Sequence, residues 1–334
     1  MKVPLLSICI PTYNRSAYLK ETILSVIRQI DKLDVWMIEI CISDNASTDG
    51  TDVLIKEIEK STPVRIVYKR NEHNMGADAN YLCSVDIASG DYCWFLGSDD
   101  VAVPGSLQTI LHEIKQKRDI YLFNRIDCNI NLKPLCKRFW LSKLISEEEF
   151  DFADPADFKR YTNLSNSLGS LFSYLSSIVF KRQKWKAIQI DPDFMGTAYS
   201  HVYMLMSFLK TGCVLKYNAA HLVFSRGDND SFLDPGSDGA IRRIMIDING
   251  YLLLSEKLFH DSIEHFNGVL RVVRAERPVL RTLVSLRLRT DRPTWEMVAG
   301  QFHRCGYPLY VISLIGLTKP MLVAAKGIRK IVFG

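Results

Sequence analysis

Four short apolar runs alternate with polar turns and helix-like segments in the first hundred residues of this chain. Each run is typical of a buried strand, and each is followed by a polar cluster. The strands are expected at 7–10, 38–42, 64–68 and 92–96. A strand, a turn and a helix that recur about every 25 to 30 residues predict an α/β protein with a parallel sheet and crossover helices.

The polar clusters follow the carboxyl ends of all four expected strands. They begin near Pro11, Ser43, Asn71 and Ser98. In open parallel sheets, ligands bind in the crevice beyond these strand ends. Clusters that are far apart in the sequence are therefore expected to converge on one binding site.

Asp99 and Asp100 stand out because they follow the buried run 92–96 with only Gly97 and Ser98 between them. Carboxylates are costly to bury without partners. Hard oxygen ligands at a strand end suit a divalent cation such as Mg²⁺ or Mn²⁺, which often carries substrate phosphates. A solvated acidic turn is the alternative interpretation.

The ordered clusters resemble the signature motifs of family 2 glycosyltransferases of the GT-A fold. This resemblance covers about residues 4–125 and rests on the segments 10–14, 44–51, 71–76 and 98–100. A narrower resemblance, to abequosyltransferases of bacterial O-antigen assembly, reaches to about residue 255. It rests on the segments 172–177, 196–201 and 226–232.

The resemblance implies a GT-A, Rossmann-like and mostly parallel sheet with flanking helices, followed by a mainly helical C-terminal region. The expected parts are a nucleotide-sugar-binding half (1–125) and an acceptor-binding half (126–235) of the GT-A domain. A basic, amphipathic helical region (236–334) is expected to contact a membrane surface or another subunit.

A nucleotide-diphosphate sugar needs partners for its base, its ribose and its diphosphate. The donor-binding residues implied by the resemblance are Pro11, Thr12, Tyr13, Arg15, Asp44, Asn74, Gly76, Asn80, Ser98, Asp99 and Arg226. Tyr13 offers an aromatic face to the base, and Arg226 could clamp a phosphate. The alternatives are packing for Tyr13, helix capping for Asp44, structural roles for the segment 74–80 and a surface turn around Arg226.

In the family pattern, the first carboxylate of the Asp99–Asp100 pair binds the ribose and the second binds the metal. The resemblance therefore assigns Asp100 to Mg²⁺ or Mn²⁺. In the polar segment after residue 226, Asp228 or Asn229 could complete the metal shell. The cation would hold the diphosphate and stabilise the negative charge that grows as the glycosidic bond breaks. Gly97 stands where many relatives carry a third acidic residue.

An inverting transferase needs a general base near the acceptor hydroxyl. Many family members supply a Glu-Asp pair at the start of a helix, where this chain has the segment 198–201. Histidine is the residue type that can take up a proton near neutral pH, so His201 is one candidate base. Asp191 and Asp193 are the other candidates. A retaining enzyme would not need such a base, and the sequence leaves the stereochemistry open.

Composition and charge indicate the cellular compartment and the kinds of partner to expect. The eight cysteines form no Cys-x-x-Cys pair, which favours a reducing cytoplasm, and the chain enters a strand at once, which argues against a secretory signal. Residues 271–334 carry twelve Lys/Arg and three Asp/Glu, which is a net charge of +9. Because the whole chain has a net charge of +5, residues 1–270 carry a net charge of −4. Interleaved apolar residues predict amphipathic helices in the basic segment 271–334, and nucleic acid is not an expected partner.

The uncharged stretch 307–318 is too short to span a bilayer, which takes about twenty residues. We expect a helix that lies in the membrane interface, with Tyr307 and Tyr310 at headgroup level and the basic residues of 326–330 toward anionic lipid. Packing on the domain or on a partner subunit is the alternative, and homo-oligomerisation is left open.

The sequence thus predicts a metal-dependent glycosyltransferase at the cytoplasmic, inner face of a bacterial plasma membrane. By resemblance, it moves a (dideoxy)hexosyl group from a nucleotide-diphosphate sugar, such as CDP-abequose, to a polyprenyl-diphosphate-linked O-antigen saccharide. A non-catalytic nucleotide-sugar-binding or scaffold protein is the alternative, because the Glu-Asp pair is missing. A nucleotidyltransferase or a dehydrogenase is disfavoured, since residues 7–20 contain no glycine for a phosphate-binding loop.

Overall fold

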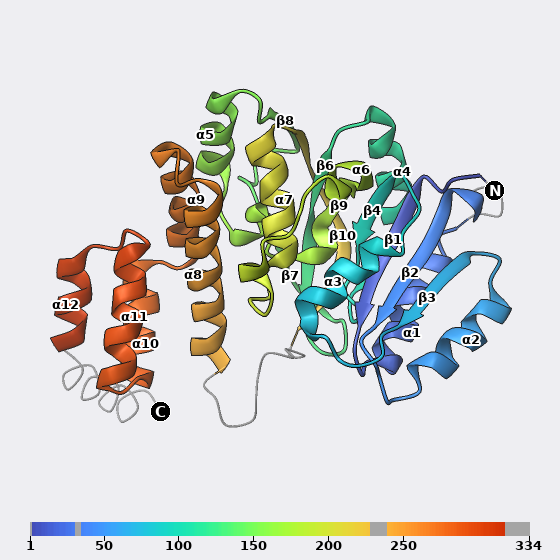
Figure 1. Ribbon diagram of the computed structural model, residues 1–334, viewed down its shortest axis with the longest axis horizontal. Coiled ribbons are helices and arrows are strands. Elements are labelled where there is room, and N and C mark those ends of the chain that lie inside the picture. The colour runs from blue at the N-terminus through green and yellow to red at the C-terminus, as the bar shows by residue number, and fades with distance from the viewer. Residues whose placement is uncertain (1, 31–34, 228–238, 318–334) are drawn as a thin grey trace. The chain divides into compact units, whose positions relative to one another are not determined.

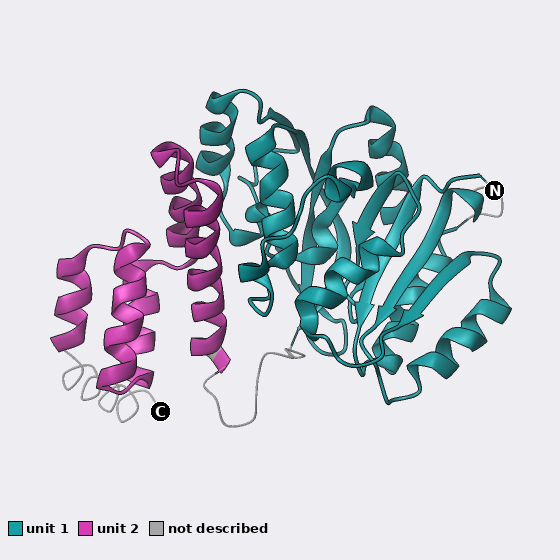
Figure 2. Ribbon diagram, in the orientation of Figure 1, with its two compact units in different colours: residues 1–229 teal, residues 230–334 magenta. Residues whose placement is uncertain are grey.

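The computed structural model describes residues 2–30, 35–227 and 239–317 (Figure 1). The chain divides into two compact units, residues 1–229 and residues 230–334 (Figure 2). Unit 1 is an α/β domain with a single large sheet, and the described part of unit 2 is helical. The division of the first 235 residues into a donor half and an acceptor half stays a prediction.

The amino-terminal half of the sheet contains the four strands expected from the apolar runs. They are β1 (Leu6–Thr12), β2 (Ile38–Asp44), β3 (Arg65–Arg70) and β4 (Tyr92–Phe95). The strands pair in parallel in the order β3-β2-β1-β4. The predicted α/β class is therefore confirmed, and β1 and β2 continue into the polar clusters that follow their apolar runs.

The rest of the sheet is mainly antiparallel. Its strands are β5 (Val101–Ala102), β6 (Ile120–Cys128), β7 (Pro134–Arg138), β8 (Glu147–Asp151), β9 (Ile178–Lys181) and β10 (Val214–Arg226). β9 runs antiparallel to both β4 and β6, whereas β6 and β10 are parallel. The expectation of a mostly parallel sheet thus needs correction beyond β4, where strands are joined without the regular strand–helix alternation that parallel pairing requires.

Helices cover both faces of the sheet (Figure 1). The α-helices of unit 1 are α1 (Ser16–Ile27), α2 (Thr51–Ser61), α3 (Gly76–Asp86), α4 (Ser106–Glu113), α5 (Pro155–Leu164), α6 (Arg182–Lys186) and α7 (Ser200–Thr211). Short 3₁₀ turns include η2 (Ile114–Gln116), η4 (Leu175–Ser177) and η5 (Pro192–Phe194). α1 contacts α2, while α3 packs on β1 and β2 and also contacts α7.

A hydrophobic cluster holds α1 and α4 on the sheet. It contains Ile8 of β1, Ile40 of β2, Leu19 and Ile23 of α1, and Ile110 of α4, all of which are fully buried or nearly so. Burying one such side chain contributes about 2 kcal/mol. This cluster fixes the strand directions, and with them the edge at which the polar clusters meet.

A buried carboxylate organises the opposite, amino edge of the sheet. Glu39 of β2 accepts hydrogen bonds from the Ser7 hydroxyl (2.6 Å) and the Ser89 backbone N–H (2.6 Å), and it lies 3.3 Å from the Arg65 guanidinium. The Ser7 hydroxyl also accepts from the Gly90 N–H (2.8 Å). Burial alone would raise the pKa of Glu39, but the hydrogen bonds and Arg65 outweigh it and hold the pKa below its usual range.

The described part of unit 2 is helical, as the sequence predicts. Its helices are α8 (Gly239–Leu258), α9 (Ile263–Glu276), α10 (Val279–Arg289), α11 (Arg292–Arg304) and α12 (Leu309–Leu317). α12 packs on α10 and α11. Within the described ranges, no helix combines the length and the apolar character that crossing a membrane would take.

The two tyrosines expected at headgroup level differ in exposure. Tyr307 is 2% exposed and its hydroxyl donates to the Arg277 carbonyl (2.7 Å), so Tyr307 belongs to the core of unit 2 and its expected headgroup position is wrong. Tyr310 is 77% exposed. The basic residues of 326–330 lie outside the described residues.

Replacing Glu39 with Gln should lower the free energy of unfolding by about 2 kcal/mol at pH 7, because the buried hydrogen bonds lose their charged acceptor. A carboxylate whose pKa is depressed by folding stabilises the protein above its unfolded pKa of about 4.3 and stops doing so as the pH falls through the folded pKa. The difference between wild type and E39Q should therefore shrink below about pH 4. Urea unfolding of both proteins from pH 7 to below about pH 4 measures this difference in the free energy of unfolding. The exposed Glu57 of α2 supplies the control E57Q, and equal losses in both variants would contradict this account.

Candidate active site

The carboxyl ends of β1, β2 and β4 meet at one edge of the sheet. Thr12 ends β1 directly opposite Asp44, which ends β2. The backbone N–H of Asn45 donates to the Thr12 carbonyl (3.0 Å). Arg15, from the loop after β1, forms an ion pair with Asp99, from the loop after β4. The expected convergence of the separate clusters is therefore confirmed.

Asp44 is fully buried and organises the second cluster. Its Oδ2 accepts a hydrogen bond from the Tyr68 hydroxyl (2.7 Å) and lies 3.8 Å from the Arg70 guanidinium. Its Oδ1 accepts from the Ser47 N–H (2.9 Å). Because α2 begins only at Thr51, Asp44 does not cap that helix, and its carboxylate instead stays fixed at the strand end.

Asparagine side chains join the second and third clusters to α3. The Asn45 amide donates to Asn74 Oδ1 (2.6 Å), and the Asn71 amide donates to Asn45 Oδ1 and Asn80 Oδ1 (both 3.3 Å). The Asn80 amide donates to the Thr12 carbonyl (3.2 Å). Asn74 and Asn80 thus hold the loops together in this conformation, and their nucleotide-binding role stays a prediction. Sequence reasoning did not select Asn45 or Asn71, although both lie inside the clusters.

The residues of the expected base pocket differ in accessibility. Pro11 is buried within β1, opposite Ser43, whereas Tyr13 in the following loop is 45% exposed. The ring of Tyr13 is therefore open to a ligand, and the packing alternative does not describe it. Gly76, at the start of α3, has a φ of +83°, a left-handed conformation that favours glycine. This backbone requirement explains Gly76 without a ligand.

Asp100 lies in a buried pocket of hydroxyl groups. Its Oδ2 accepts hydrogen bonds from the hydroxyls of Tyr174 (2.6 Å) and Ser176. Burial and the adjacent charge of Asp99 raise the pKa of Asp100 to about 6, against the opposing effect of the two hydroxyls. Tyr174 and Ser176 were not predicted as site residues, although their segment, 172–177, carries part of the narrower resemblance.

Gly97 leaves the space that these contacts require. A Cβ atom at this position would lie 2.9 Å from Asp100 Oδ2 and 3.3 Å from Ser176 Oγ. The Ser176 hydroxyl also accepts a hydrogen bond from the Gly97 N–H (2.8 Å). An acidic residue at position 97 would therefore collide with Asp100, and the Ser176 hydroxyl lies beside the space that its side chain would need.

Arg226, at the end of β10, is committed to protein contacts. Its side chain is 4% exposed, it pairs with Glu21, and its guanidinium lies 4.5 Å from the centre of the Tyr18 ring. It donates to the carbonyls of Asp99 (3.1 Å) and Ile130 (2.6 Å). In this conformation the Arg226 side chain is buried and bonded to protein groups, so its role as a phosphate clamp stays a prediction, and the rest of its segment, from residue 228, lies outside the described residues. Arg226 braces the loop that carries Asp99.

His201 of α7 lies in the interior and is 4% exposed. Its Nε2 is 3.1 Å from the Phe172 carbonyl oxygen, and its ring meets the edges of Tyr81 of α3 (5.3 Å) and Phe95 of β4 (6.4 Å). These contacts pack α7 against α3 and β4. The role of His201 as a base stays a prediction that this buried position does not favour.

The segment that replaces the Glu-Asp pair of many relatives is fixed by Asp78 of α3. The Asp78 carboxylate is buried and accepts from the N–H groups of Ala198 (2.8 Å) and Ser200 (3.0 Å). This contact attaches the start of α7 to α3. This contact could not be predicted from the sequence, because a carboxylate in the first turn of a helix usually interacts with its own helix.

The remaining acidic candidates lie apart from these contacts. Asp191 accepts from the N–H of Asp193 (2.9 Å) and starts the turn η5, and Asp193 itself is exposed. Their catalytic roles stay predictions, and Asp228 lies outside the described residues. Within those residues no three His, Cys, Asp or Glu side chains gather as a metal site. Mg²⁺ often binds one or two carboxylates together with substrate phosphates, so the pair Asp99–Asp100 still fits a substrate-borne cation.

Replacing Arg226 with Gln should lower the free energy of unfolding by about 3 kcal/mol, because two backbone carbonyls and a carboxylate lose a buried cationic donor. Denaturant unfolding of the full chain measures the loss. The exposed Arg28 provides the control R28Q, whose effect should stay within about 0.5 kcal/mol. If both substitutions had the same small effect on the free energy of unfolding, the proposed stabilisation of the Asp99 loop by Arg226 would be contradicted.

The sequence matches a known family over half of its length. Residues 7–179 match the family described as Glycosyl transferase family 2. The chain is 41% identical over 285 residues to the abequosyltransferase RfbV of Salmonella typhimurium, and the alignment covers 84% of each protein. It is also 32% identical over 115 residues to the GalNAc(5)-diNAcBac-PP-undecaprenol beta-1,3-glucosyltransferase of Campylobacter jejuni, covering 34% of this chain and 36% of the relative.

Solved structures of low sequence identity share the fold. S. aureus TarS 1–349 in complex with UDP superposes with a TM-score of 0.62 at 14% identity, covering 96% of this chain and 87% of TarS. The mannosyltransferase PcManGT from Pyrobaculum calidifontis, in complex with GDP-Man and Mn²⁺, gives a TM-score of 0.54 at 13% identity, covering 99% and 88%. Together with the carboxylates at the strand ends, these findings show that the protein belongs to glycosyl transferase family 2 and is a GT-A-fold glycosyltransferase resembling the abequosyltransferases.

Proposed function

We propose that this glycosyltransferase moves a dideoxyhexosyl group from a CDP-sugar, such as CDP-abequose, to a lipid-linked O-antigen saccharide. The identity to an abequosyltransferase over 84% of both chains supports the sugar class. The observation that carries the proposal is the meeting of Asp44, Arg15, Asp99 and Asp100 at one strand edge. The non-catalytic alternative loses its support, because the chain belongs to a family of enzymes and keeps both carboxylates of the pair.

In the proposed complex, the base stacks on the open ring of Tyr13. The buried Asp44 carboxylate holds the end of β2 in place through Tyr68 and Ser47. Arg15 and Asp99 each have a side-chain exposure of 19%, so their ion pair lies within reach of a ligand. Donor binding exchanges this pair for two new contacts. Asp99 accepts from ribose hydroxyls, and the guanidinium of Arg15 turns to a phosphate, where charge-assisted hydrogen bonds are strong.

Asp100 is the proposed ligand of Mg²⁺ or Mn²⁺. Both hydrogen bonds to its carboxylate from described residues reach Oδ2, which leaves Oδ1 for a cation. When bound, the cation supplies charge neutralisation for the departing nucleoside diphosphate. Tyr174 and Ser176 orient the carboxylate, and the hydrogen bond from Gly97 N–H to Ser176 fixes the turn that carries it. The Mn²⁺ in the structure of PcManGT supports a divalent cation in this fold.

The proposed acceptor is bound to a polyprenyl diphosphate, so the enzyme has to work at a membrane surface. Support comes from α12, whose buried residues Ile312 and Ile315 face the unit. Exposed apolar residues lie on its other side, namely Leu309 (57%), Tyr310 (77%), Leu314 (62%) and Leu317 (81%). An apolar face of this kind, in a basic region, suits shallow insertion into an anionic leaflet. We therefore place the protein at the inner face of the plasma membrane, through α12.

Replacing Asp100 with Asn should lower kcat/KM for transfer about a hundredfold or more, because the cation loses its protein carboxylate. Nucleotide release from CDP-, dTDP-, UDP- and GDP-sugars, with a polyprenyl-diphosphate-linked saccharide as acceptor, measures the activity and ranks the donors. EDTA should abolish it and Mn²⁺ should restore it. The exposed Asp86 of α3 gives the control D86N. Full activity of D100N in EDTA would refute the metal role, and a preference for another nucleotide would refute the CDP donor.

The double substitution Tyr310→Glu and Leu314→Glu should reduce binding to vesicles of anionic phospholipid at least tenfold, since it places charges on the apolar face of α12. Vesicle flotation of the full chain measures the bound fraction. Leu144 is 95% exposed in unit 1 and provides the matched control L144E. Unchanged flotation, together with loss of a dimer in light scattering, would assign the face to a partner subunit instead.

A further inference from the structure

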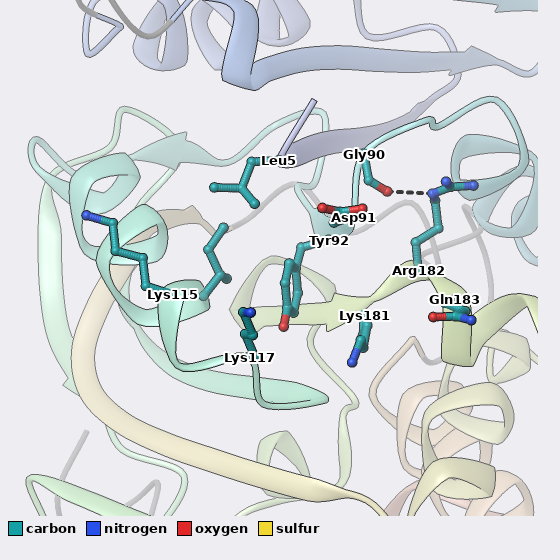
Figure 3. Close-up of a pocket in the computed structure, with 10 residues that line it drawn as sticks. Leu5, Gly90, Asp91, Tyr92, Lys115, Lys117, Lys181, Arg182 and Gln183 are labelled. Atoms are coloured by element: carbon teal, nitrogen blue, oxygen red, sulfur yellow. Dashed lines mark hydrogen bonds between the residues drawn. The ribbon is translucent and has the colours of Figure 1, made fainter. Parts of the chain in front are cut away.

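A cavity of about 520 Å³ lies at the edge of the sheet opposite to Asp44 and Asp99 (Figure 3). It is bounded by Leu5, just before β1, by Tyr92, at the start of β4, and by Lys181, at the end of β9. Tyr92 and Lys181 are neighbours in the antiparallel register of β4 and β9. Neither donor binding nor transfer, as described above, uses this end of the sheet.

The floor of the cavity is apolar and fixed. Ile114 is 2% exposed and Tyr92 is 4% exposed. The Tyr92 hydroxyl donates to the Arg118 carbonyl (2.9 Å), which holds the ring in place. Only small parts of the Ile114 and Tyr92 side chains reach the cavity, and together with Leu5 they make this part of its lining apolar.

The rim of the cavity is cationic (Figure 3). No ion pair or side-chain hydrogen bond engages the ammonium groups of Lys115 and Lys117 within the part of the chain that the structure describes. Lys181 lies 3.9 Å from Asp119, a distance at which the pair is loose. Lys115, Lys117 and Lys181 thus all line the cavity, although the ammonium group of Lys115 points outward in Figure 3, and Asp91 adds one carboxylate.

The wall of the cavity is preformed. Arg182 donates to the carbonyls of Ser89 (3.1 Å) and Gly90, and the second contact is drawn in Figure 3. A Cβ atom at Gly90 would lie 2.7 Å from the Ser7 hydroxyl, so the loop can approach β1 only because this residue is a glycine. The ion pairs and hydrogen bonds of Glu39 hold Ser7 and Ser89 from the other side. A rigid wall lowers the entropy cost of binding.

Lys117 occupies a backbone conformation that a glycine would adopt more easily. Its φ is +60° and its ψ is +31°, in the left-handed region, at the end of the turn η2. A side chain there costs roughly 1 kcal/mol relative to glycine. The chain therefore carries an unpaired ammonium group at the cavity at some cost to its stability, which a purely solvated lysine would not explain.

We propose that this cavity binds a compact phosphate monoester whose body has an apolar face. The volume lies within the range of about 300 to 1,000 Å³ that is usual for small-ligand sites. Lysine ammonium groups bind phosphate as point charges, and the ring of Tyr92 with Leu5 and Ile114 takes the apolar face. The Asp91 carboxylate accepts a hydrogen bond from a hydroxyl or amino group of the ligand body.

Titration of the full chain with 1-naphthyl phosphate in EDTA, followed by calorimetry, tests the proposal. We expect one site with a Kd below about 1 mM, and at least tenfold weaker binding of inorganic phosphate, which lacks the apolar body. The variant K115A/K117G should weaken naphthyl phosphate at least tenfold. Its melting temperature should not fall, because glycine relieves the left-handed strain at position 117.

The matched control K56A/K60A removes two exposed lysines from α2 and should bind as the wild type does. Excess CDP should not displace the probe, because the donor site lies at the other edge of the sheet. Equal affinities of wild type and K115A/K117G, or displacement of the probe by CDP, would overturn the proposal. Equal binding of inorganic phosphate and naphthyl phosphate would overturn the role of the apolar floor.

Discussion

A carboxylate can be buried in a protein only where donors or cations reach it, and this constraint determines how unit 1 is assembled. Glu39, Asp44, Asp78 and Asp100 are all buried, and each is bonded by groups from another segment of the chain. The hydrophobic cluster stabilises the sheet, but its apolar contacts do not determine where the loops lie. The buried carboxylates specify the loops, and the site is a consequence of that specification.

The ion pair of Arg15 and Asp99 fits the same scheme. Without a ligand, two partly buried charges at the strand edge neutralise each other, so the site can form without a substrate. An incoming donor has to offer an anion for Arg15 and hydroxyl groups for Asp99 at the same time. A ligand that offers only one of these breaks the ion pair but gives a new contact to only one of the two charges, which favours an intact nucleotide sugar over its fragments.

The sequence predicted β1 to β4 and the convergence of their polar ends, because short apolar runs such as 92–96, each followed by a polar turn, are typical of buried strands. It did not predict the antiparallel pairing of β9, since a four-residue strand carries no information about its direction. The roles of His201 and Arg226 were equally hidden, because a titratable or cationic side chain looks alike in a sequence whether it faces a substrate or the core. Ser176 and Asp78 were missed since their partners lie 76 and 120 residues away along the chain.

A side chain at position 97 would lie close to both Asp100 Oδ2 (2.9 Å) and the Ser176 hydroxyl (3.3 Å). A change at position 97 or 176 therefore disturbs the contacts of the other. An acid introduced at 97 alone meets a collision, and a larger residue introduced at 176 alone breaks the turn. Lineages of this enzyme that differ at one position should differ at the other, and such paired change would mark the point where the metal-binding loop diverged from that of the wider family.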